Sequence, residues 1–380
     1  MTTAMPDLTA ATPDARADHR GSPIPNWAMI ATRFLELRKR RGLMITLVLV
    51  TIGFPTVFLG IRLLLHAVAP KTYGSAGGYD IYTAMSAGVL YTFGFIVAAA
   101  LGATAGSVDL SDGMFRHLVI TGRSRLALYL ARIPAGLAII VSLVAVGFTI
   151  VCAVCVFAAP AKLHYNGVAV PAGLSESGLE TWAAANATTV VCNFNYSFKD
   201  QSGPGVGCDN PPGAPAHVVA IGPGGRPVPA TAAQTQAAAV QIARQNYPDY
   251  AKQFRYPSVS LMIKTGLWLE LEAVVGFIVG LGLGSLLGQR TVAVILMIVL
   301  EIILTPIAIR TRIPHFLNGQ RGIVGVATAH LEPGQLPLAF GGGGHDFRVT
   351  ETTTTAVLVI LGWLIGWTIL GAWRMITRDA

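Results

Sequence analysis

The 380-residue chain is short of charged residues. Asp, Glu, Lys and Arg make up 12% of it, about half of the roughly 25% that is usual in soluble domains. Hydrophobic residues make up 53%, they occur in blocks, and the mean hydropathy is +0.58. This composition excludes an ordinary soluble domain and indicates an integral membrane protein that lies in a lipid bilayer. The net charge of +8 is accounted for by membrane topology, so we expect no nucleic-acid partner.

Motifs that carry chemistry are also absent. The sequence contains no G-x-x-x-x-G-K-[ST], so the chain has no P-loop with which to bind ATP itself. Its eight His residues show no metal-ligand spacing such as H-E-x-x-H, and there is no G-x-S-x-G nucleophile elbow. We therefore expect a protein that is not an enzyme and that binds no metal and no cofactor of its own.

Cysteine is scarce, with four in the chain. Cys152 and Cys155 lie inside an apolar run and are interpreted as small packing residues. Cys192 and Cys208 lie in a polar segment and enclose about 15 residues. In an oxidising compartment a disulfide between them is expected to contribute about 3 kcal/mol to stability. Two free thiols are the alternative.

Six apolar segments are long enough to cross a membrane. Each has about 19 or more residues, which at 1.5 Å per residue covers about 30 Å of hydrocarbon. The pattern predicts an all-α integral membrane protein with six transmembrane helices, an N-terminal interfacial amphipathic helix and a large extracytoplasmic loop between helices 3 and 4. Helices 1–3 would occupy residues 43–157 and helices 4–6 residues 265–373. The individual spans are predicted at roughly 43–65, 83–105, 129–157, 265–287, 291–309 and 354–373.

Lys and Arg set the expected orientation. "RKRR" at 38–41 abuts the first span, and Arg290 lies in the short turn between spans four and five. Arg374 and Arg378 follow the last span. With the N-terminus inside, Lys and Arg are about twice as dense in the inner segments as in the outer ones, in agreement with the positive-inside rule. The first apolar run is too long for the core of a cleaved signal peptide. We expect a multi-pass protein of the plasma membrane with both termini, including the tail 374–380, in the cytoplasm.

The segment before the first span has two parts. Residues 1–25 are rich in Ala, Thr, Asp and Pro and are expected to form a disordered cytoplasmic tail. In residues 26–41, Asn26 is a candidate N-cap and apolar residues share one helical face, which predicts an amphipathic helix on the inner membrane surface. The apolar face comprises Trp27, Ile30, Ala31, Phe34 and Leu37, while Arg33, Arg38, Lys39 and Arg40 are expected on the remaining surface.

Two further segments are expected outside the membrane. Residues 158–264 are far longer than a connector requires, which predicts a small extracytoplasmic domain or lid. Within it, the Ala-rich stretch 231–247 predicts a helix that is capped by Thr231 and ended by Pro248. Residues 310–353 are weakly apolar and rich in Gly and Pro, and are expected to cover the bundle or to dip into the membrane interface.

The polar segment "DLSDGMFRHLVITGRSR", residues 109–125, lies between spans two and three. Ser111 or Asp112 can cap a short helix there, and Gly122 can end it. Phe115 and Leu118 would form the apolar side of this helix, which could dock into a groove of a partner protein. A basic loop without a partner is the alternative. The polar, basic side would comprise Arg116, His117, Arg123 and Arg125.

The stretch "GATAGSVDLSDGMFRHLVITGRSRLALYLARIPAGLA", residues 102–138, resembles the corresponding region of ABC-2-type permeases, the membrane subunits of ABC exporters. The amphipathic helix at 26–41 and the six-span layout resemble that family as well, so the resemblance covers most of the chain. The long segment 158–264 departs from the family's short connector and leaves its part in substrate handling open. The matching positions are Asp109, Gly113, Phe115, Arg116, Thr121, Ser124, Arg125 and Arg132.

The resemblance implies a division of work between chains. A separate ABC ATPase subunit would bind ATP and Mg²⁺, and two permease chains, identical or different, would form the working complex. The segment 109–125 would couple the permease to the ATPase, with Gly113 at a tight turn, Phe115 in the ATPase groove and Arg116 beside its carboxylates. The candidate coupling residues are Asp109, Asp112, Gly113, Phe115, Arg116, His117, Leu118, Arg123 and Arg125.

Two other classes of protein stay open at this stage. One is an ion- or proton-coupled secondary transporter that needs no ATPase. Inverted repeats would favour it, and none is evident between the two halves of the sequence. The other is a membrane sensor or assembly factor whose outside loop binds a ligand.

Three carboxylates fall inside predicted spans. Glu301 lies near the middle of span five, and Glu270 and Glu272 lie in span four. A central carboxylate costs about 2.5–3.5 kcal/mol on insertion, so it should face the bundle or a wet cavity. Residues two apart on a helix do not share a face, so Glu270 and Glu272 cannot both line one path. These acids are candidates for a substrate path or a proton site, and contacts that merely hold helices together are the alternative.

Overall fold

The structure, a computed structural model, describes residues 22–69, 72–73, 76–111, 124–159, 162–165, 168–171, 173–194, 206–209, 217–221, 226–253, 257–313, 315–333, 349 and 351–377. Among these residues, six helical segments of 20 to 33 residues are long and apolar enough to cross a membrane, which makes the chain a multi-pass membrane protein. They coincide with the six predicted spans and extend most of them by about one turn.

Several spans are built from shorter helices joined by a π-helical turn. Span one comprises α2 (Arg41–Val48), η2 (Leu49–Gly53) and α3 (Phe54–Val68). Span two comprises α4 (Tyr79–Thr83), η3 (Ala84–Leu90) and α5 (Tyr91–Ser111), and span three comprises α7 (Arg125–Leu130) and α8 (Arg132–Phe157). Span four is α12 (Val259–Leu287), span five comprises α13 (Arg290–Ile298), η5 (Val299–Leu304) and α14 (Thr305–Arg310), and span six is α17 (Thr353–Thr377).

Spans two and four form the centre of the bundle by packing backbone against backbone. A Cβ added to Gly280 of span four would lie 2.4 Å from the carbonyl oxygen of Ala99 in span two. The contact is reciprocal, because a Cβ added to Gly102 would lie 2.1 Å from the carbonyl oxygen of Phe277. Small residues at such positions let membrane helices approach closely. The two spans therefore behave as one unit against which the others pack.

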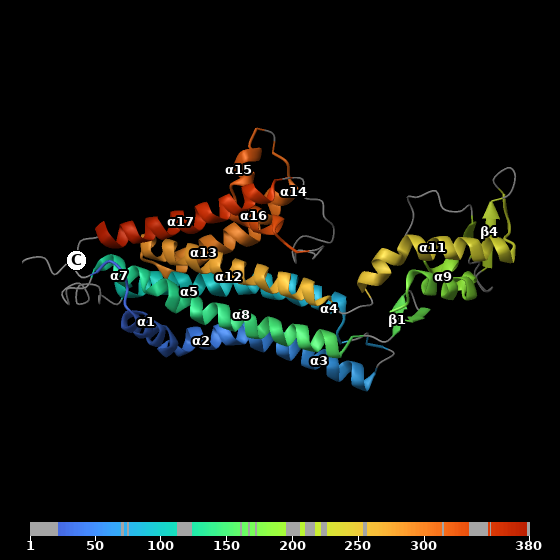
Figure 1. The fold of residues 1–380 in the computed structure, drawn as a ribbon, viewed down its shortest axis with the longest axis horizontal. Coiled ribbons are helices and arrows are strands. Elements are labelled where there is room, and N and C mark those ends of the chain that lie inside the picture. The colour runs from blue at the N-terminus through green and yellow to red at the C-terminus, as the bar shows by residue number, and fades with distance from the viewer. Residues whose placement is uncertain are drawn as a thin grey trace, which may run out of the picture.

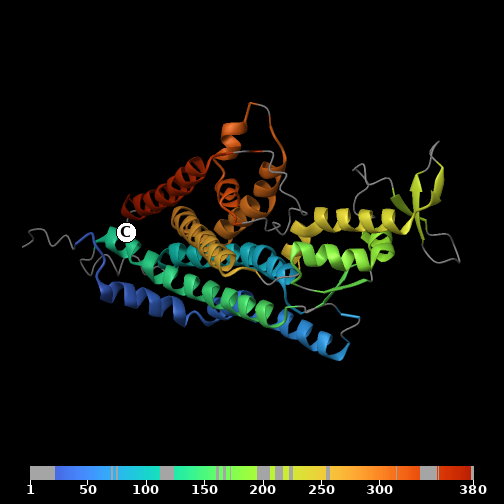
Figure 2. The same ribbon diagram turned by 45° about the vertical axis from the view of Figure 1, so that its right-hand side comes forward.

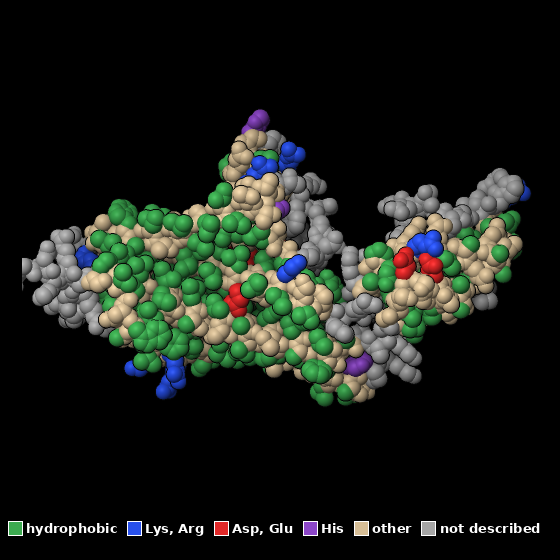
Figure 3. All heavy atoms as spheres, in the orientation of Figure 1, with side chains coloured by type: hydrophobic (Ala, Val, Ile, Leu, Met, Phe, Trp, Pro, Cys, Tyr) green, Lys and Arg blue, Asp and Glu red, His purple; other side chains and the backbone are tan. Residues whose placement is uncertain are grey.

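Spans one, five and six lie at the periphery of the bundle and expose most of their apolar side chains. Leu64 of span one, Ile295 of span five and Ile365 of span six are each more than half exposed. The space-filling view shows a mainly hydrophobic surface over the bundle (Figure 3). Such a surface is what contact with lipid tails requires.

The two ends of the bundle differ in what they carry. Helix α1 (Trp27–Lys39) and the last turn of α17 lie at one end, which we call the terminal end, and residues 162–253 form a separate unit beyond the opposite end, which we call the lid end (Figure 1 and Figure 2). The predicted cap of α1 is confirmed, because Asn26 Oδ1 accepts a hydrogen bond from the Met29 N–H at 2.9 Å. The prediction for Arg33 is wrong. It lies on the buried face of α1 at 8% exposure, because its charge is paired within the protein.

The lid unit combines helices with short strands. Strand β1 (Lys162–Tyr165) pairs antiparallel with β2 (Val168–Pro171), and β3 (Val206–Asp209), β4 (His217–Ile221) and β5 (Pro227–Pro229) form an antiparallel sheet in that order. Helices α9 (Glu176–Ala185), α10 (Ala187–Phe194) and α11 (Ala232–Gln253) complete the unit around a core that includes Leu179, Val191 and Ile242. The all-α prediction therefore holds for the bundle but not for the lid unit, whose strands are too short to show a clear alternating pattern.

The disulfide considered for the lid unit is present, and it joins Cys192 of α10 to Cys208 of β3. The unit ends earlier than the predicted residue 264, since span four already begins at Val259. Lys264 lies inside that helix with its side chain exposed. A lysine near a helix end can keep its ammonium in water while its stem covers apolar surface, so it does not mark the boundary of the span.

Helix α11 is longer than predicted. Its start is as expected, because the Thr231 hydroxyl accepts from the Gln234 N–H at 3.3 Å and the Gln234 side chain accepts from the Thr231 N–H at 2.9 Å, the reciprocal pattern of a capping box. Its end is not at Pro248, which lies inside the helix. Tyr250 holds the turn beyond the proline, because its hydroxyl donates to the carbonyl of Pro171. This tertiary contact outweighs the hydrogen bond that the proline removes.

The segment between spans five and six enters the bundle. Helix α15 (Leu317–Arg321) leads into α16 (Val324–His330), and residues 324–329 are all buried. The indole N–H of Trp363 in span six donates to the carbonyl of Gly322 at 2.8 Å and fixes the turn between the two helices. The described residues of 310–353 thus pack against the bundle through α16.

Candidate functional site

Two of the three predicted intramembrane acids come together. Glu272 of α12 is 1% exposed and Glu301 of η5 is 4% exposed, and the two carboxyl groups are close enough for a charge on Glu301 to act on Glu272. Glu270 is only partly buried and lies on another face of α12, as its two-residue offset from Glu272 requires. The structure thus separates the span-four acids and brings one of them to the span-five acid.

Widened helical turns position this site. Glu301 lies within η5, and Tyr91 follows directly after η3. In span five the cause is local: Pro306 has no N–H to donate, and the Thr305 hydroxyl donates to the carbonyl of Leu300, five residues back, at 3.0 Å. Insertions of π-helix are rare and are found frequently at functional sites.

Glu301 has a hydrogen-bond donor on one of its oxygens and, near the other, a hydroxyl whose proton is directed to Leu300. The Tyr91 hydroxyl from span two donates to Oε1. The Thr305 hydroxyl, one turn further along span five, lies 3.5 Å from Oε2. Because donors stabilise the ionised form of a carboxyl group, Glu301 is the member of the pair that can carry negative charge.

Glu272 has no such support. Neither of its oxygens has a hydrogen-bond partner among the residues that the structure describes. The Thr328 hydroxyl of α16 faces it, yet that hydroxyl donates to the carbonyl of Gly325 at 3.3 Å. Ionisation of a buried carboxyl group is strongly unfavourable when no hydrogen-bond donor faces it.

Aromatic side chains and α16 enclose the pair. The Trp268 ring, one turn before Glu272, stacks on Tyr91 with ring centroids 4.9 Å apart and planes 5° apart. The Trp268 indole N–H donates to the carbonyl of Thr328 at 2.9 Å, which ties α12 to α16. Helix α16 therefore lies over the acids as part of one packed unit with spans two and four.

Two more carboxyl groups lie outside the spans, in the segment between spans five and six. Glu332 follows α16, and burial raises the pKa of its carboxyl to about 8. Burial also raises the pKa of the Glu351 carboxyl, an effect that His330 and Arg321 oppose. No sequence pattern marks either residue, because both lie in residues 310–353, which are predicted to lie outside the membrane. Tyr91, Trp268, Thr305 and Thr328 were also missed, because only the tertiary fold brings them to the acids.

The chemistry open to this cluster is that of carboxyl groups, a phenol and hydroxyls. It can bind and release protons, and it can attract positive charge. Among the described residues, no group of three or more His, Cys, Asp or Glu side chains is arranged to hold a metal ion.

The predicted coupling segment lies mostly outside the described residues. Its positions there are Asp112, Gly113, Phe115, Arg116, His117, Leu118 and Arg123. Of the remaining two, Asp109 lies in the last turn of α5 and Arg125 begins α7.

The helix ends that flank this segment are anchored to other elements of the bundle. Arg125 Nη1 donates to the carbonyl of Ile376 at the end of span six, at 3.0 Å. Arg132, which is 2% exposed, directs Nη1 to the carbonyl of Gly106 in span two at 3.4 Å. Both contacts link the start of span three to another span at the terminal end.

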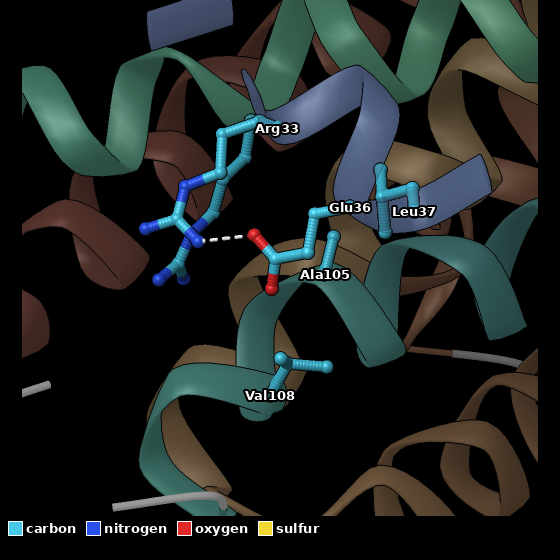
Figure 4. Close-up of a pocket in the computed structure, with 6 residues that line it drawn as sticks. Arg33, Glu36, Leu37, Ala105 and Val108 are labelled. Atoms are coloured by element: carbon cyan, nitrogen blue, oxygen red, sulfur yellow. Dashed lines mark hydrogen bonds and ion pairs between the residues drawn. The ribbon is translucent and has the colours of Figure 1, made fainter. Parts of the chain in front are cut away.

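A small pocket lies at the same end, between α1 and the ends of spans two and three. Arg33 and Glu36 of α1 point toward each other over Ala105 and Val108 of α5, and Arg33 Nη1 lies 2.6 Å from Glu36 Oε2 (Figure 4). This pair explains why Arg33 is buried. The lining residues are Arg33, Glu36, Leu37, Ala105, Val108 and Arg132.

Comparison of the chain with protein-family models, with curated proteins and with solved structures gives no match. The residues of both sites are therefore interpreted from their own geometry and chemistry, and the family resemblance seen in the sequence stays a hypothesis.

Proposed function

We propose that this chain is the membrane-spanning permease subunit of an ATP-driven ABC transporter, in which a separate ATPase docks on residues 109–125. One structural observation carries the proposal. The helix ends on both sides of that segment are anchored. The start of span three is hydrogen-bonded to spans two and six, and the end of span two packs against α1. A force applied to the segment would reach the whole bundle, which is what a coupling element needs.

The proposed mechanism follows from these anchors. Closure of the ATPase pair would push on residues 109–125. Arg125 would transmit the movement to span six and Arg132 to span two. Because spans two and four pack backbone to backbone, span four would move with span two. Rocking of these spans would alternate access between the two sides of the membrane.

The remaining parts of the proposal rest on the sequence: the orientation rests on the distribution of Lys and Arg, and the direction of transport and the partners rest on the family resemblance. The terminal end would face the cytoplasm, the lid unit would lie outside the plasma membrane, and transport would be outward. The partner ATPase would bind ATP and Mg²⁺, and a second permease chain, identical or different, would complete the complex.

The test is co-purification of the intact chain in detergent from its native cells, followed by identification of an ATPase with a P-loop. We expect Phe115→Ala combined with Arg116→Glu to abolish ATPase association and leave membrane insertion intact, since the apolar contact is lost and the charge is reversed. Arg226→Glu makes the same charge reversal on an exposed residue of the lid unit and is the matched control. Normal recovery of the complex with the double variant would remove the coupling assignment.

A second candidate, an ion- or proton-coupled transporter, is favoured by the buried pair of Glu272 and Glu301, since intramembrane acids commonly mark proton or ion pathways. Co-purification separates the two candidates. An ATPase bound through residues 109–125 supports the permease, and a chain that is active without any ATPase supports the coupled transporter.

A further inference from the structure

Glu272 is a buried acid that the hydrogen bonds of the described residues do not stabilise. It is 1% exposed, and neither carboxylate oxygen has a hydrogen-bond partner among the described residues. An ionised carboxylate without donors is strongly unfavourable in an apolar interior, and such a group takes up a proton instead. The neutral, protonated form of Glu272 is the one that these surroundings favour.

Glu301 differs from Glu272 in its surroundings, because it accepts from Tyr91 and lies near the Thr305 hydroxyl. Two carboxyl groups that interact in a low-dielectric site do not readily ionise together and instead share one proton. The Tyr91 donor at Glu301, and the lack of a donor at Glu272 among the described residues, favour the arrangement in which Glu272 holds the shared proton.

We propose that Glu272 and Glu301 form a binding site for one exchangeable proton inside the bundle, and that Glu332 connects this site to the lid end. A proton that leaves Glu272 passes to ionised Glu332, which becomes neutral and then releases it to water. Uptake follows the same steps in reverse. Each transfer conserves the proton, and release leaves both members of the pair ionised, a costly state that uptake of a proton relieves.

A proton fits this site better than a larger cation does. A Cβ added to Gly325 would lie 2.9 Å from Glu301 Oε2 and 2.2 Å from Thr305 Oγ1, so the space between α16 and Glu301 does not admit even a methyl group. A metal ion requires several oxygen ligands around it, and an organic amine requires still more room. A proton needs no cavity.

The route to the lid end is built from groups on either side of Glu332. Glu332 follows α16, the helix that lies over the pair, and its Oε1 is buried without a hydrogen-bond partner among the described residues. A charge on Glu332 acts on Glu272 and on Tyr79, which begins span two at the lid end. Burial raises the pKa of Glu332 to about 8, so near neutral pH it can both accept and donate a proton. Glu332 thus stands between the enclosed pair and the surface.

The titratable groups that face Glu272 come from three directions. Glu301 faces it from span five, Tyr91 from span two and Glu332 from the turn after α16, and Thr328 of α16 adds a hydroxyl. None of these groups is a cation. Each ionisation near the pair therefore adds repulsion and favours retention of the proton.

This inference does not depend on an ATPase partner. Under the proposed permease function, it means that the spans carry a proton whose release accompanies the conformational cycle. The test uses the isolated full-length chain, so a failure to find an ATPase and a failure to find the proton are separate results.

The experiment is infrared difference spectroscopy of the purified full-length chain in lipid nanodiscs, recorded through a pH titration. Near neutral pH, we expect the carbonyl stretch of a protonated carboxylic acid, shielded from rapid exchange with D₂O. Glu272→Gln should abolish this band. Glu270→Gln, which removes a carboxyl from another face of the same helix, should leave it unchanged. Glu301→Gln should move the midpoint of the titration by about one pH unit or more, which is a tenfold change in proton affinity.

The route is tested by the exchange rate of the same band. Glu332→Gln should slow its deuterium exchange by about tenfold or more, because a proton relay is removed, and should leave the band itself in place. A wild-type chain without the band, a band that persists in Glu272→Gln, or a band that appears only with added alkali metal ions or amines would overturn the proposal. If Glu272→Gln does not fold, the Glu301→Gln shift and ¹³C-labelling of glutamate decide the assignment.

Discussion

Gly325 of α16 lies directly against Glu301 of span five. A Cβ at position 325 would be 2.9 Å from Glu301 Oε2 and 2.2 Å from the Thr305 hydroxyl. The lack of a side chain is thus what allows α16 to close over the buried acids. The close packing of α16 at Gly325 is therefore also what encloses the acid pair.

We predict that Gly325→Ala destabilises the protein by about 1–3 kcal/mol, because the added methyl cannot be accommodated without moving α16. Thermal unfolding in detergent, followed with a thiol-reactive dye that reports exposure of Cys155, which is buried, measures the change. Gly362→Ala in span six is the matched control, since no atom lies within 4 Å of the added methyl. It should be neutral or slightly stabilising, because Ala favours helix more than Gly does. Equal unfolding temperatures for the two variants would contradict the prediction.

Glu301→Gln should impair transport and leave the amount of protein in the membrane unchanged. The amide keeps the size of the side chain and its contact with Tyr91, but it cannot ionise. We expect a loss of about tenfold or more, equivalent to about 1.4 kcal/mol. The measurement is complementation of a deletion strain across a drug-sensitivity panel, with membrane levels read by immunoblotting. Glu270→Gln should behave as wild type, and an equal fall in both function and protein level would indicate that Glu301 only holds the helices together.

The spans were predictable because the membrane imposes a length. About 20 apolar residues are needed to cross the hydrocarbon, and nothing else in the chain has that pattern. The N-cap at Asn26 was predictable for a local reason, since a side-chain acceptor three residues before a free N–H is encoded in adjacent residues. Such features depend on neighbours in the sequence alone.

The meeting of Glu272 and Glu301 was not predictable, because it depends on which spans are neighbours. A cost of burial could be assigned to each acid separately, but their pairing with Tyr91 follows from the packing of spans two, four and five and from the π-helical turns η3 and η5. The burial of Arg33 has the same origin. Its ion pair with Glu36 faces residues of span two that are about 70 positions away in the sequence.

Removal of the disulfide should loosen the lid unit without affecting the bundle. The bond between Cys192 and Cys208 spans 16 positions, for which the chain-entropy argument gives about 3 kcal/mol. We expect Cys192→Ser combined with Cys208→Ser to raise the rate of proteolysis within residues 162–253 and to speed hydrogen exchange in α10 and β3. Cys152→Ala, which removes a thiol from span three, should leave the lid unit as resistant as in the wild type. Unchanged proteolysis of the double variant would show that the core of the lid unit suffices without the bond.

Glu332 should make stability depend on pH. Burial raises the pKa of its carboxyl to about 8 in the folded protein, against about 4.3 in an unfolded chain. The folded state therefore binds this proton more tightly. Its contribution is fully present below about pH 4 and is lost as the pH rises through about 8, with a magnitude of about 3 kcal/mol after allowance for partial exposure.

The measurement is the unfolding temperature of wild type and Glu332→Gln between about pH 5 and pH 9, a range that covers the titration of a group with a pKa near 8. The wild-type value should fall as the pH rises, whereas the variant should show a flatter profile and gain stability at the alkaline end, because the neutral amide incurs no cost of ionisation. Glu176→Gln, at an exposed carboxyl of the lid unit, should reproduce the wild-type profile. If the unfolding temperature of Glu332→Gln falls as steeply with pH as that of the wild type, Glu332 is solvated when it is ionised. The proposed proton route would then lack a buried carboxyl group between the pair and the lid end.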